Sequence, residues 1–257
     1  MSANRAQLLK DIGLKAGHCL KDFFGKKLDI RKKGELDLVT QADETAERLI
    51  VDAISSTFPN DAILAEEGHS KEGDSGYQWI IDPLDGTTNF SHAFPHFSVS
   101  IALSHQNEVT HGLVYDPIKD ECFEARLGVG AWLNGNPIRI GWRENLSEAL
   151  AVTGFSYDRR DRMDFLLERV RLMLNHCQGM RRLGSAALDL CYIASGRFDV
   201  YIEDGLNAWD IAAGQLIVRE AGGLATQLNG GPLSLTKGEV LAANPAIHAQ
   251  ALQRLIH

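Results

Sequence analysis

Two carboxylates at the end of a short apolar run are the residues of this sequence best suited to chemistry. Trp79, Ile80 and Ile81 have the bulk and β-branching of a buried strand, and the chain continues Asp-Pro-Leu-Asp-Gly-Thr-Thr-Asn-Phe. Asp-Pro and Asp-Gly are turn dipeptides, so we expect Asp82 and Asp85 where a strand leaves the core. Such oxygen ligands suit Mg²⁺, which prefers one or two carboxylates, waters and a substrate phosphate. An ordinary Asp-capped turn would contain the same pair, so the other acids must decide between the two interpretations.

Further acidic positions follow apolar segments elsewhere in the chain. Glu66 and Glu67 come after Ala-Ile-Leu-Ala, and Asp43 and Asp210 each lie where a helical pattern begins. Each has a structural explanation, since Thr40 with Asp43 fits a capping box and Asp210 fits a helix N-cap. Taken together, these acids predict a cluster of negative charges. Two like charges about 4 Å apart repel by on the order of 4 kcal/mol at an effective dielectric constant near 20, so a cluster of these acids needs a cation.

The periodicity of the chain predicts the elements that would position these acids. Apolar residues at helical spacing predict helices at 8–23, 43–58, 161–174, 185–194 and 210–221. Strand patterns occur at 62–65, 79–81, 97–103, 109–115, 121–127, 198–202 and 224–228, and serines form one polar face of 97–103. Asn134-Gly135 is typical of a tight hairpin turn. This order predicts a layered α/β (α+β) architecture with more than one sheet.

The length and composition of the chain narrow its class. We expect a single compact unit over residues 1–257, with a seam near 141–149 between an N-terminal α+β half and a C-terminal α/β half. The net charge of -8 argues against a broad basic surface for nucleic acid. No apolar run approaches the roughly 18 residues of a membrane span, and the N-terminus lacks the apolar core of a signal peptide. The four cysteines, far apart in sequence, are expected to be reduced thiols of a cytoplasmic protein.

The acidic motifs, in this order and spacing, closely resemble those of the inositol monophosphatase family. The resemblance covers nearly the whole chain: Asp-Leu-Val-Thr-x-x-Asp, Glu-Glu, Asp-Pro-Leu-Asp-Gly-Thr-Thr-Asn-Phe, Gly-Ser-Ala-Ala, the stretch from Glu203 to Trp209, and Trp-Asp-x-Ala-Ala-Gly. It implies a layered α-β-α-β-α sandwich of the inositol monophosphatase and fructose-1,6-bisphosphatase type, usually assembled as a homodimer. It further implies a Mg²⁺-dependent, lithium-sensitive phosphomonoesterase that hydrolyses myo-inositol monophosphate or a similar polyol phosphate.

The resemblance also implies a set of metal ligands. Two Mg²⁺ ions, and a third in some relatives, would be held by Glu66, Asp82, the carbonyl of Leu84, Asp85 and Asp210. Asp82 would bridge two of the ions. Such a two-metal site stabilises both the attacking and the leaving oxygen of an in-line displacement.

Catalytic and substrate-binding roles follow from the same resemblance. Thr87 would orient the attacking water, Asp43 would polarise the Thr87 hydroxyl, and Glu66 would act with them through the third ion. Backbone N–H groups of Gly86 and Thr87 would cradle the phosphate. The full set of expected substrate contacts is Asp85, Gly86, Thr87, Gly184, Ser185, Ala186, Glu203 and Asp210.

A few positions leave open the alignment of one lysine with the family, the preferred substrate and the role of the protein. Lys32, or Lys33 one residue on, aligns with the lysine of a loop near the metals, and Asn207 replaces a histidine of some animal relatives. The alternative substrates are fructose 1,6-bisphosphate, histidinol phosphate and an adenosine bisphosphate, although Asp-Gly-Thr-Thr-Asn-Phe favours the inositol type. A different role is that of a regulatory partner of RNA polymerase and ribosome biogenesis, for which Arg181 and Arg182 are the only indication.

Overall fold

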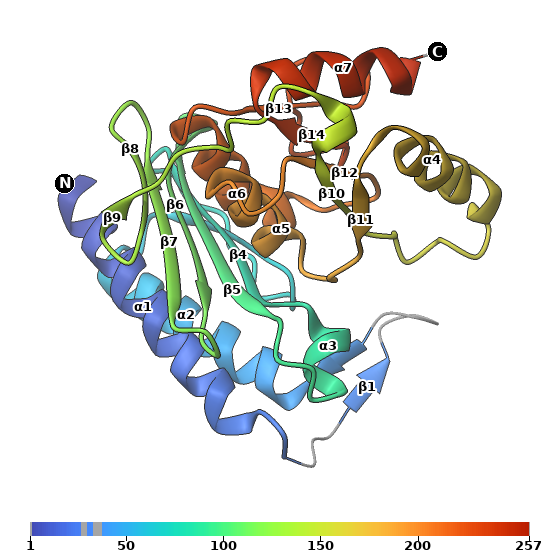
Figure 1. Cartoon of the computed structure of the whole chain (residues 1–257). Helices are drawn as coiled ribbons and strands as arrows, with labels where there is room; N and C mark the ends of the chain where they lie inside the picture. Colours follow the sequence, from blue (N-terminus) through green and yellow to red (C-terminus); the bar gives the residue numbers. More distant parts are fainter. Residues whose placement is uncertain (1, 27–29, 33–37, 257) are drawn as a thin grey trace.

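Two β-sheets alternate with three helical layers in the computed structural model, which describes residues 2–26, 30–32 and 38–256 (Figure 1). The first layer holds α1 (Ser2–Phe23) and α2 (Gln41–Thr57), and the middle layer holds α5 (Ala186–Ala194) and α6 (Ala208–Glu220). The outer layer holds α4 (Met163–His176) and α7 (Pro245–Ile256). This order confirms the α-β-α-β-α sandwich expected from the sequence.

The sheet between the first and middle layers has seven strands in the order β3-β4-β5-β6-β7-β8-β9. Only β3 and β4 of these strands run parallel, and the other neighbours are antiparallel. The register of β4 against β5 shifts between Asp82 and Asp85, where Pro83 cannot donate to the ladder. The strands are β3 (Ala62–Ala65), β4 (Tyr77–Asp85), β5 (Ser98–His105), β6 (Glu108–Asp116), β7 (Glu121–Arg126), β8 (Gly130–Leu133) and β9 (Asn136–Pro137).

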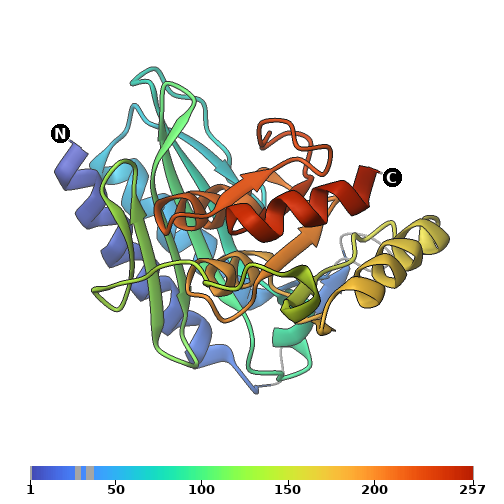
Figure 2. The same cartoon turned by 45° about the horizontal axis from the view of Figure 1, so that its top comes forward.

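The second sheet lies between the middle and outer layers and has five strands in the order β11-β10-β12-β14-β13. The first three run parallel, and β14 is antiparallel to both of its neighbours. Figure 2 shows α7, in red, lying across this sheet. Its strands are β10 (Leu150–Thr153), β11 (Gly179–Arg181), β12 (Val200–Glu203), β13 (Leu224–Thr226) and β14 (Val240–Ala243).

Three hydrophobic clusters fill the spaces between the five layers. Alternation along a strand divides its side chains between two of them: Trp79 and Ile81 of β4 pack toward α1 and α2, whereas Ile80 packs toward α5 and α6. In β12, Val200 and Ile202 face the outer layer and Tyr201 faces the middle layer. Residues two positions beyond Ile80 and Tyr201 therefore point toward the middle layer.

Most predicted elements are present, and among the strands of the two large sheets and the helices of the three layers the sequence missed β10, β11, β14 and α7. The Asn134-Gly135 turn joins β8 to β9, with a positive φ at both residues as a tight hairpin requires. The serine face of β5 is buried under the middle layer, where Ser100 Oγ donates to the carbonyl of Trp209 (3.2 Å). Small elements complete the chain: β1 (Ile30–Lys32), β2 (Leu38–Thr40), α3 (Thr87–Ser91) and the 3₁₀ helix η1 (Leu146–Glu148).

The segment between the two sheets, the length of the helices and the cysteines bear on three further expectations. The segment 141–149 connects the seven-stranded sheet to the five-stranded sheet, and its role as a seam between two halves stays a prediction. No helix within the described ranges is long and apolar enough to cross a lipid bilayer. All four cysteines have free thiols, as their spacing predicted.

Candidate functional site

A cavity of about 360 Å³ opens where the end of β4 meets the first turns of α5 and α6. It gathers every residue that the sequence predicted as a metal ligand or substrate contact. These are Glu66, Asp82, Leu84, Asp85, Gly86, Thr87, Gly184, Ser185, Ala186, Glu203 and Asp210. Asp43, the remaining predicted residue, does not line the cavity and reaches it through Thr87.

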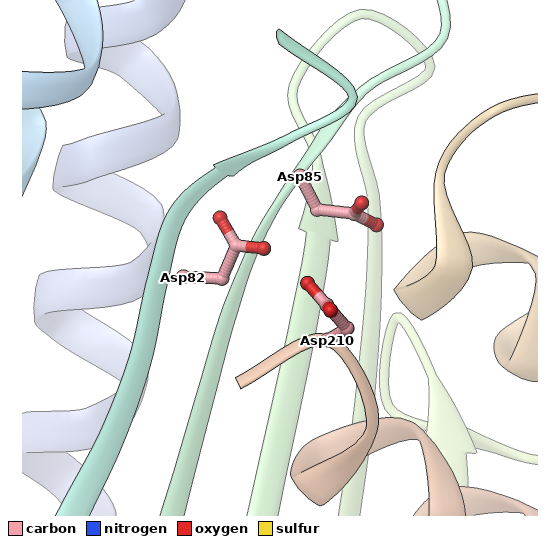
Figure 3. A group of neighbouring side chains, drawn as sticks. All are labelled: Asp82, Asp85 and Asp210. Carbon is pink, nitrogen blue, oxygen red and sulfur yellow. The ribbon is translucent and has the colours of Figure 1, made fainter. Parts of the chain in front are cut away.

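Three carboxylates meet at the floor of this cavity. Asp82 and Asp85 come from the end of β4 and Asp210 from the first turn of α6, and Figure 3 shows them pointing toward one another. Each offers an oxygen that lies within 4.8 Å of the other two. Asp82 shares the strand face of Ile80, so its side chain points toward the helices of the middle layer. The motif and the start of α6, far apart in sequence, therefore present one group of oxygen ligands.

The electrostatics of this group favour a bound cation. Burial raises the pKa of Asp82 well above its ordinary value, and the charges of Glu66, Asp85 and Asp210 raise it further. Burial likewise raises the pKa of Asp210, with the charge of Asp85 as the next cause. Glu66 follows β3, whose Ala65 pairs with Ile81 of β4, so it lies beside Asp82 at the same sheet edge. An all-oxygen set with this mutual repulsion fits a hard divalent cation such as Mg²⁺.

Asp85 is also held firmly by the start of α5. Its Oδ2 accepts hydrogen bonds from Ser185 Oγ (2.6 Å) and Ala187 N (2.8 Å), and Ala186 N approaches Oδ1 at 3.3 Å. Burial raises the pKa of Asp85 to about 6, although these hydrogen bonds oppose the rise. A carboxylate at a helix N-terminus is further stabilised by the orphan N–H groups there. One residue thus joins β4 to α5 and still presents acceptor sites to the cavity.

The turn after Asp85 requires glycine. Gly86 has φ of 99°, and a Cβ there would lie 3.2 Å from the carbonyl oxygen of His96 and 3.3 Å from that of Gly184. A side chain would be strained in this conformation and crowded by backbone. The turn leads directly into α3, which begins at Thr87, so its N–H groups lie at a helix N-terminus.

Thr87 connects the cavity to a buried carboxylate. Its Oγ1 lies 3.1 Å from Asp43 Oδ1 and 3.0 Å from the carbonyl oxygen of Leu84. Asp43 Oδ2 accepts from both the backbone N (2.9 Å) and the Oγ1 (2.5 Å) of Thr40, which forms the predicted capping box of α2. Burial raises the pKa of Asp43 to about 6, against the opposing effect of the Thr40 hydrogen bonds. Asp43 is therefore oriented by Thr40 and leaves its other oxygen to Thr87.

Glu203 is placed at another part of the cavity by the end of β12. It shares the strand face of Tyr201, whose hydroxyl donates to Glu203 Oε2 (2.7 Å). A Cβ on Gly154 would lie 2.1 Å from the same oxygen, so only glycine leaves room for the carboxylate. Burial raises the pKa of Glu203 to about 7, whereas the Tyr201 hydroxyl lowers it. Asn207, at the N-cap of α6, donates its backbone N–H to Asp210 Oδ2 (2.6 Å).

One wall of the cavity and one arginine in its lining were not predicted from the sequence. The wall is the segment from Gly154 to Arg159, which follows β10, a strand too short for its pattern to be recognised. Arg182 also lines the cavity, and its Cζ lies 6.0 Å from the centre of the Phe155 ring. Lys33 lies outside the described residues, and Lys32 is described only as the end of β1, so the expected lysine contact stays a prediction.

The layered sandwich with an acidic cavity at its strand ends defines the class of proteins that includes the inositol monophosphatases. The model of the inositol monophosphatase family matches residues 3–257, and the chain belongs to this family. An inositol-1-monophosphatase from Synechocystis is 45% identical over 94% of this chain and 85% of its own length. The Nus factor SuhB of Pasteurella multocida is 43% identical over 94% of this chain and 91% of its own.

Solved structures agree with this assignment. The extragenic suppressor protein suhB from Bartonella henselae superposes with a TM-score of 0.93 at 39% identity, covering 97% of each chain. The inositol monophosphatase from Anabaena superposes with a TM-score of 0.89 at 38% identity, covering 99% of this chain and 96% of its own. The relatives thus carry two kinds of name, a phosphatase and a Nus factor.

Proposed function

We propose that the protein is a Mg²⁺-dependent phosphomonoesterase that hydrolyses myo-inositol monophosphate, or a similar polyol phosphate, to the polyol and inorganic phosphate. The observation that carries this proposal is the convergence of Asp82, Asp85 and Asp210 within 4.8 Å beside the Thr87–Asp43 pair. Relatives named inositol-1-monophosphatase support the choice of substrate class. The four free thiols support a cytoplasmic location.

The metal ions of this proposal would be held by side chains and one carbonyl that line the cavity. Glu66, Asp82 and the carbonyl of Leu84 would hold one ion, and Asp82, Asp85 and Asp210 would hold a second. Glu66 is the residue that would also contact a third. When bound, Mg²⁺ supplies charge that offsets the phosphoryl oxygens and makes a water molecule more acidic.

The attacking water is oriented by the chain itself. Thr87 accepts a hydrogen bond from the water while its own proton is directed at Asp43, 3.1 Å away. A carboxyl with its pKa near 6 is a suitable proton acceptor close to neutral pH. Water attacks phosphorus in line with the ester oxygen and loses a proton through Thr87 to Asp43. The phosphorus–oxygen bond to the polyol breaks, the leaving oxygen takes up a proton from solvent, and no covalent phosphoenzyme forms. The N–H groups of Gly86 and Thr87 hold the phosphate during the displacement.

The polyol is recognised on the Glu203 side of the cavity. An ionised carboxylate has sites for several hydroxyl donors, and the Tyr201 hydroxyl occupies only one of them. Gly184, Ser185 and Ala186 line the same cavity beside Asp85 and would supply the remaining contacts. The preferred ester among polyol phosphates follows from how its hydroxyls meet these groups.

The proposal is tested by phosphate release from myo-inositol 1-phosphate. Hydrolysis should require Mg²⁺, be inhibited by Li⁺, and fall by about 100-fold or more in Asp82→Asn, because a ligand is lost. Asp74→Asn, an exposed acid in the loop between β3 and β4, should retain full activity. Rapid turnover in excess EDTA would refute the metal dependence on which the proposal depends.

Two proposals on partners go with the phosphatase. Relatives named Nus factor SuhB support a regulatory contact with RNA polymerase, and Arg181, exposed on β11, is the residue to test. Polymerase should be retained by the immobilised wild type and lost with Arg181→Ala; no retention by the wild type would refute this contact.

We also expect a homodimer, because α4 exposes Met163, Phe165 and Leu167. Sedimentation equilibrium at the monomer mass would refute the dimer.

A further inference from the structure

Two arginines line the same cavity as the acidic cluster. Arg182 lies close to Gly184, where a Cβ would be 2.3 Å from its Nη1, and beside the Phe155 ring. Arg159 ends the wall that begins at Gly154, and its Nη1 lies 3.4 Å from the carbonyl oxygen of Ser156. A protein with a net charge of -8 thus places two cations at the cavity that holds its acidic cluster.

Neither arginine forms an ion pair with a carboxylate of the chain, as far as residues 2–26, 30–32 and 38–256 show. The arginines nearest in sequence behave differently. Arg162 and Arg169 both bind Asp204, at 2.7 and 3.1 Å. A guanidinium that no internal carboxylate occupies keeps most of its five N–H donors for a ligand.

The position of Arg182 is on the Glu203 side of the cavity. Burial raises the pKa of Glu203, and the hydroxyl of Tyr201 and then the charge of Arg182 oppose this rise. The charge of Arg182 also lowers the pKa of Asp85, so the electrostatics alone do not place it. Its Cζ lies 6.0 Å from the centre of the Phe155 ring, and Gly154, the residue before Phe155, lies against the Glu203 carboxylate. Arg159 bends back over Ser156, and a Cβ on Gly205, two residues after Glu203, would lie 2.4 Å from Ser156 Cβ. Both cations therefore lie near the part of the cavity that would hold the polyol.

We infer that Arg159 and Arg182 form an anion subsite, which binds a second negatively charged group on the substrate, a phosphate or a carboxylate, apart from the phosphate that is hydrolysed. This inference rests on the proposed phosphatase function and names a substrate class for it. A guanidinium recognises either group through paired N–H donors. The cavity, at about 360 Å³, lies at the small end of ligand sites, which suits a phosphorylated polyol with one further charged group.

Matched substrate pairs test the subsite. Fructose 1,6-bisphosphate against fructose 1-phosphate adds a phosphate, and 2-phosphoglycerate against glycerol 2-phosphate replaces a hydroxymethyl group by a carboxylate. For the wild type, kcat/KM should be higher by about tenfold or more for the member of at least one pair that carries two anionic groups. The pair that shows the preference identifies the second group. In Arg159→Gln/Arg182→Gln this preference should vanish, while the esters with a single anionic group keep their kcat/KM.

The matched control is Arg181→Gln, which removes the neighbouring exposed arginine and should leave the preference intact. No preference in the wild type would overturn the inference. An equal loss for both members of a pair would also overturn it, because the arginines would then only balance Glu203 and Asp85. Calorimetric titration of the same pairs in EDTA measures binding without turnover. The double variant could bind the bisphosphate more weakly than the wild type in EDTA while the wild type hydrolyses no ester in Mg²⁺. That result would support the subsite and refute the phosphatase function.

Discussion

Removing one charge from the acidic cluster should stabilise the protein when metal is absent. The carboxylate oxygens of Asp82, Asp85 and Asp210 lie within 4.8 Å of one another, and two unit charges at that separation repel by about 3 kcal/mol at an effective dielectric constant near 20. Asp82→Asn removes two such repulsions. Burial and mutual repulsion raise the pKa values of Asp82 and Asp210, and proton uptake relieves part of the repulsion, so we expect a net gain on the order of 2 kcal/mol at pH 8.

The same substitution should reverse its effect when Mg²⁺ is present. A ligand that binds only the folded protein stabilises it by about 2.7 kcal/mol at a concentration of 100 times its Kd. The wild type should gain this stabilisation, whereas Asp82→Asn lacks one of the proposed metal ligands and should gain little. For a chain of this size about 2–4 °C of Tm corresponds to 1 kcal/mol, so the variant should melt roughly 4–8 °C above the wild type in EDTA. In saturating Mg²⁺ the wild type should be the more stable of the two.

Differential scanning calorimetry in the two buffers measures this reversal directly. Asp199→Asn is the control, because Asp199 is buried but lies outside the cavity, where it accepts a hydrogen bond from Leu150 N (2.8 Å) and pairs with Arg143 (3.3 Å). That control should lose stability equally with and without Mg²⁺. If Asp82→Asn melts below the wild type in EDTA, the carboxylates do not repel as argued. If both proteins respond equally to Mg²⁺, the cation binds elsewhere.

Three further outcomes follow from the geometry of the site. Thr87→Val should lower kcat by about 100-fold with little change in KM, because it removes the hydroxyl that links water to Asp43, and it should keep the stabilisation by Mg²⁺; an unchanged kcat contradicts this role. Gly86→Ala should cost about 1–3 kcal/mol in urea unfolding and lower activity, since φ is 99° and the new Cβ meets the carbonyl of His96 at 3.2 Å; wild-type stability would contradict the strain. In EDTA, on the order of 3 kcal/mol of stability should be lost as pH rises from 4.5 to about 7, because folded Glu203 keeps a proton that the unfolded chain has released. Glu203→Gln should flatten this dependence, and a stability that rises over that range would contradict it.

Local patterns were sufficient for the elements whose signals lie within one segment. The Trp79 to Asp85 segment, the Thr40–Asp43 cap and the Asn134-Gly135 turn each contain their own chemistry, so the sequence predicted strand, helix start and hairpin there. The meeting of Asp82, Asp85 and Asp210 depends on the packing of α6 against β4, which no local pattern encodes. The family resemblance, rather than periodicity, grouped these acids before the structure did.

The elements that the sequence missed are those defined by distant partners. Leu150–Thr153 has only four residues, and it becomes the strand β10 by pairing in parallel with β11 and β12. The wall from Gly154 to Arg159 follows β10 directly, so its position depends on that pairing. Arg181 and Arg182 are the same residue type, and the sequence alone does not tell that Arg181 ends β11 whereas Arg182 lines the cavity.

The structural interpretation of the acids is confirmed, and it leaves room for the proposed cation site. Asp82 Oδ1 accepts a hydrogen bond from Leu84 N (3.0 Å), as an Asp-capped turn predicts, and Asp43 and Asp210 close capping boxes at α2 and α6. A carboxylate has about four acceptor sites, so a cap leaves the others to a ligand. Each cap also fixes the side chain before any ligand arrives, which lowers the entropy lost on binding. The caps therefore orient the acids, and their mutual repulsion supplies the preference for a cation.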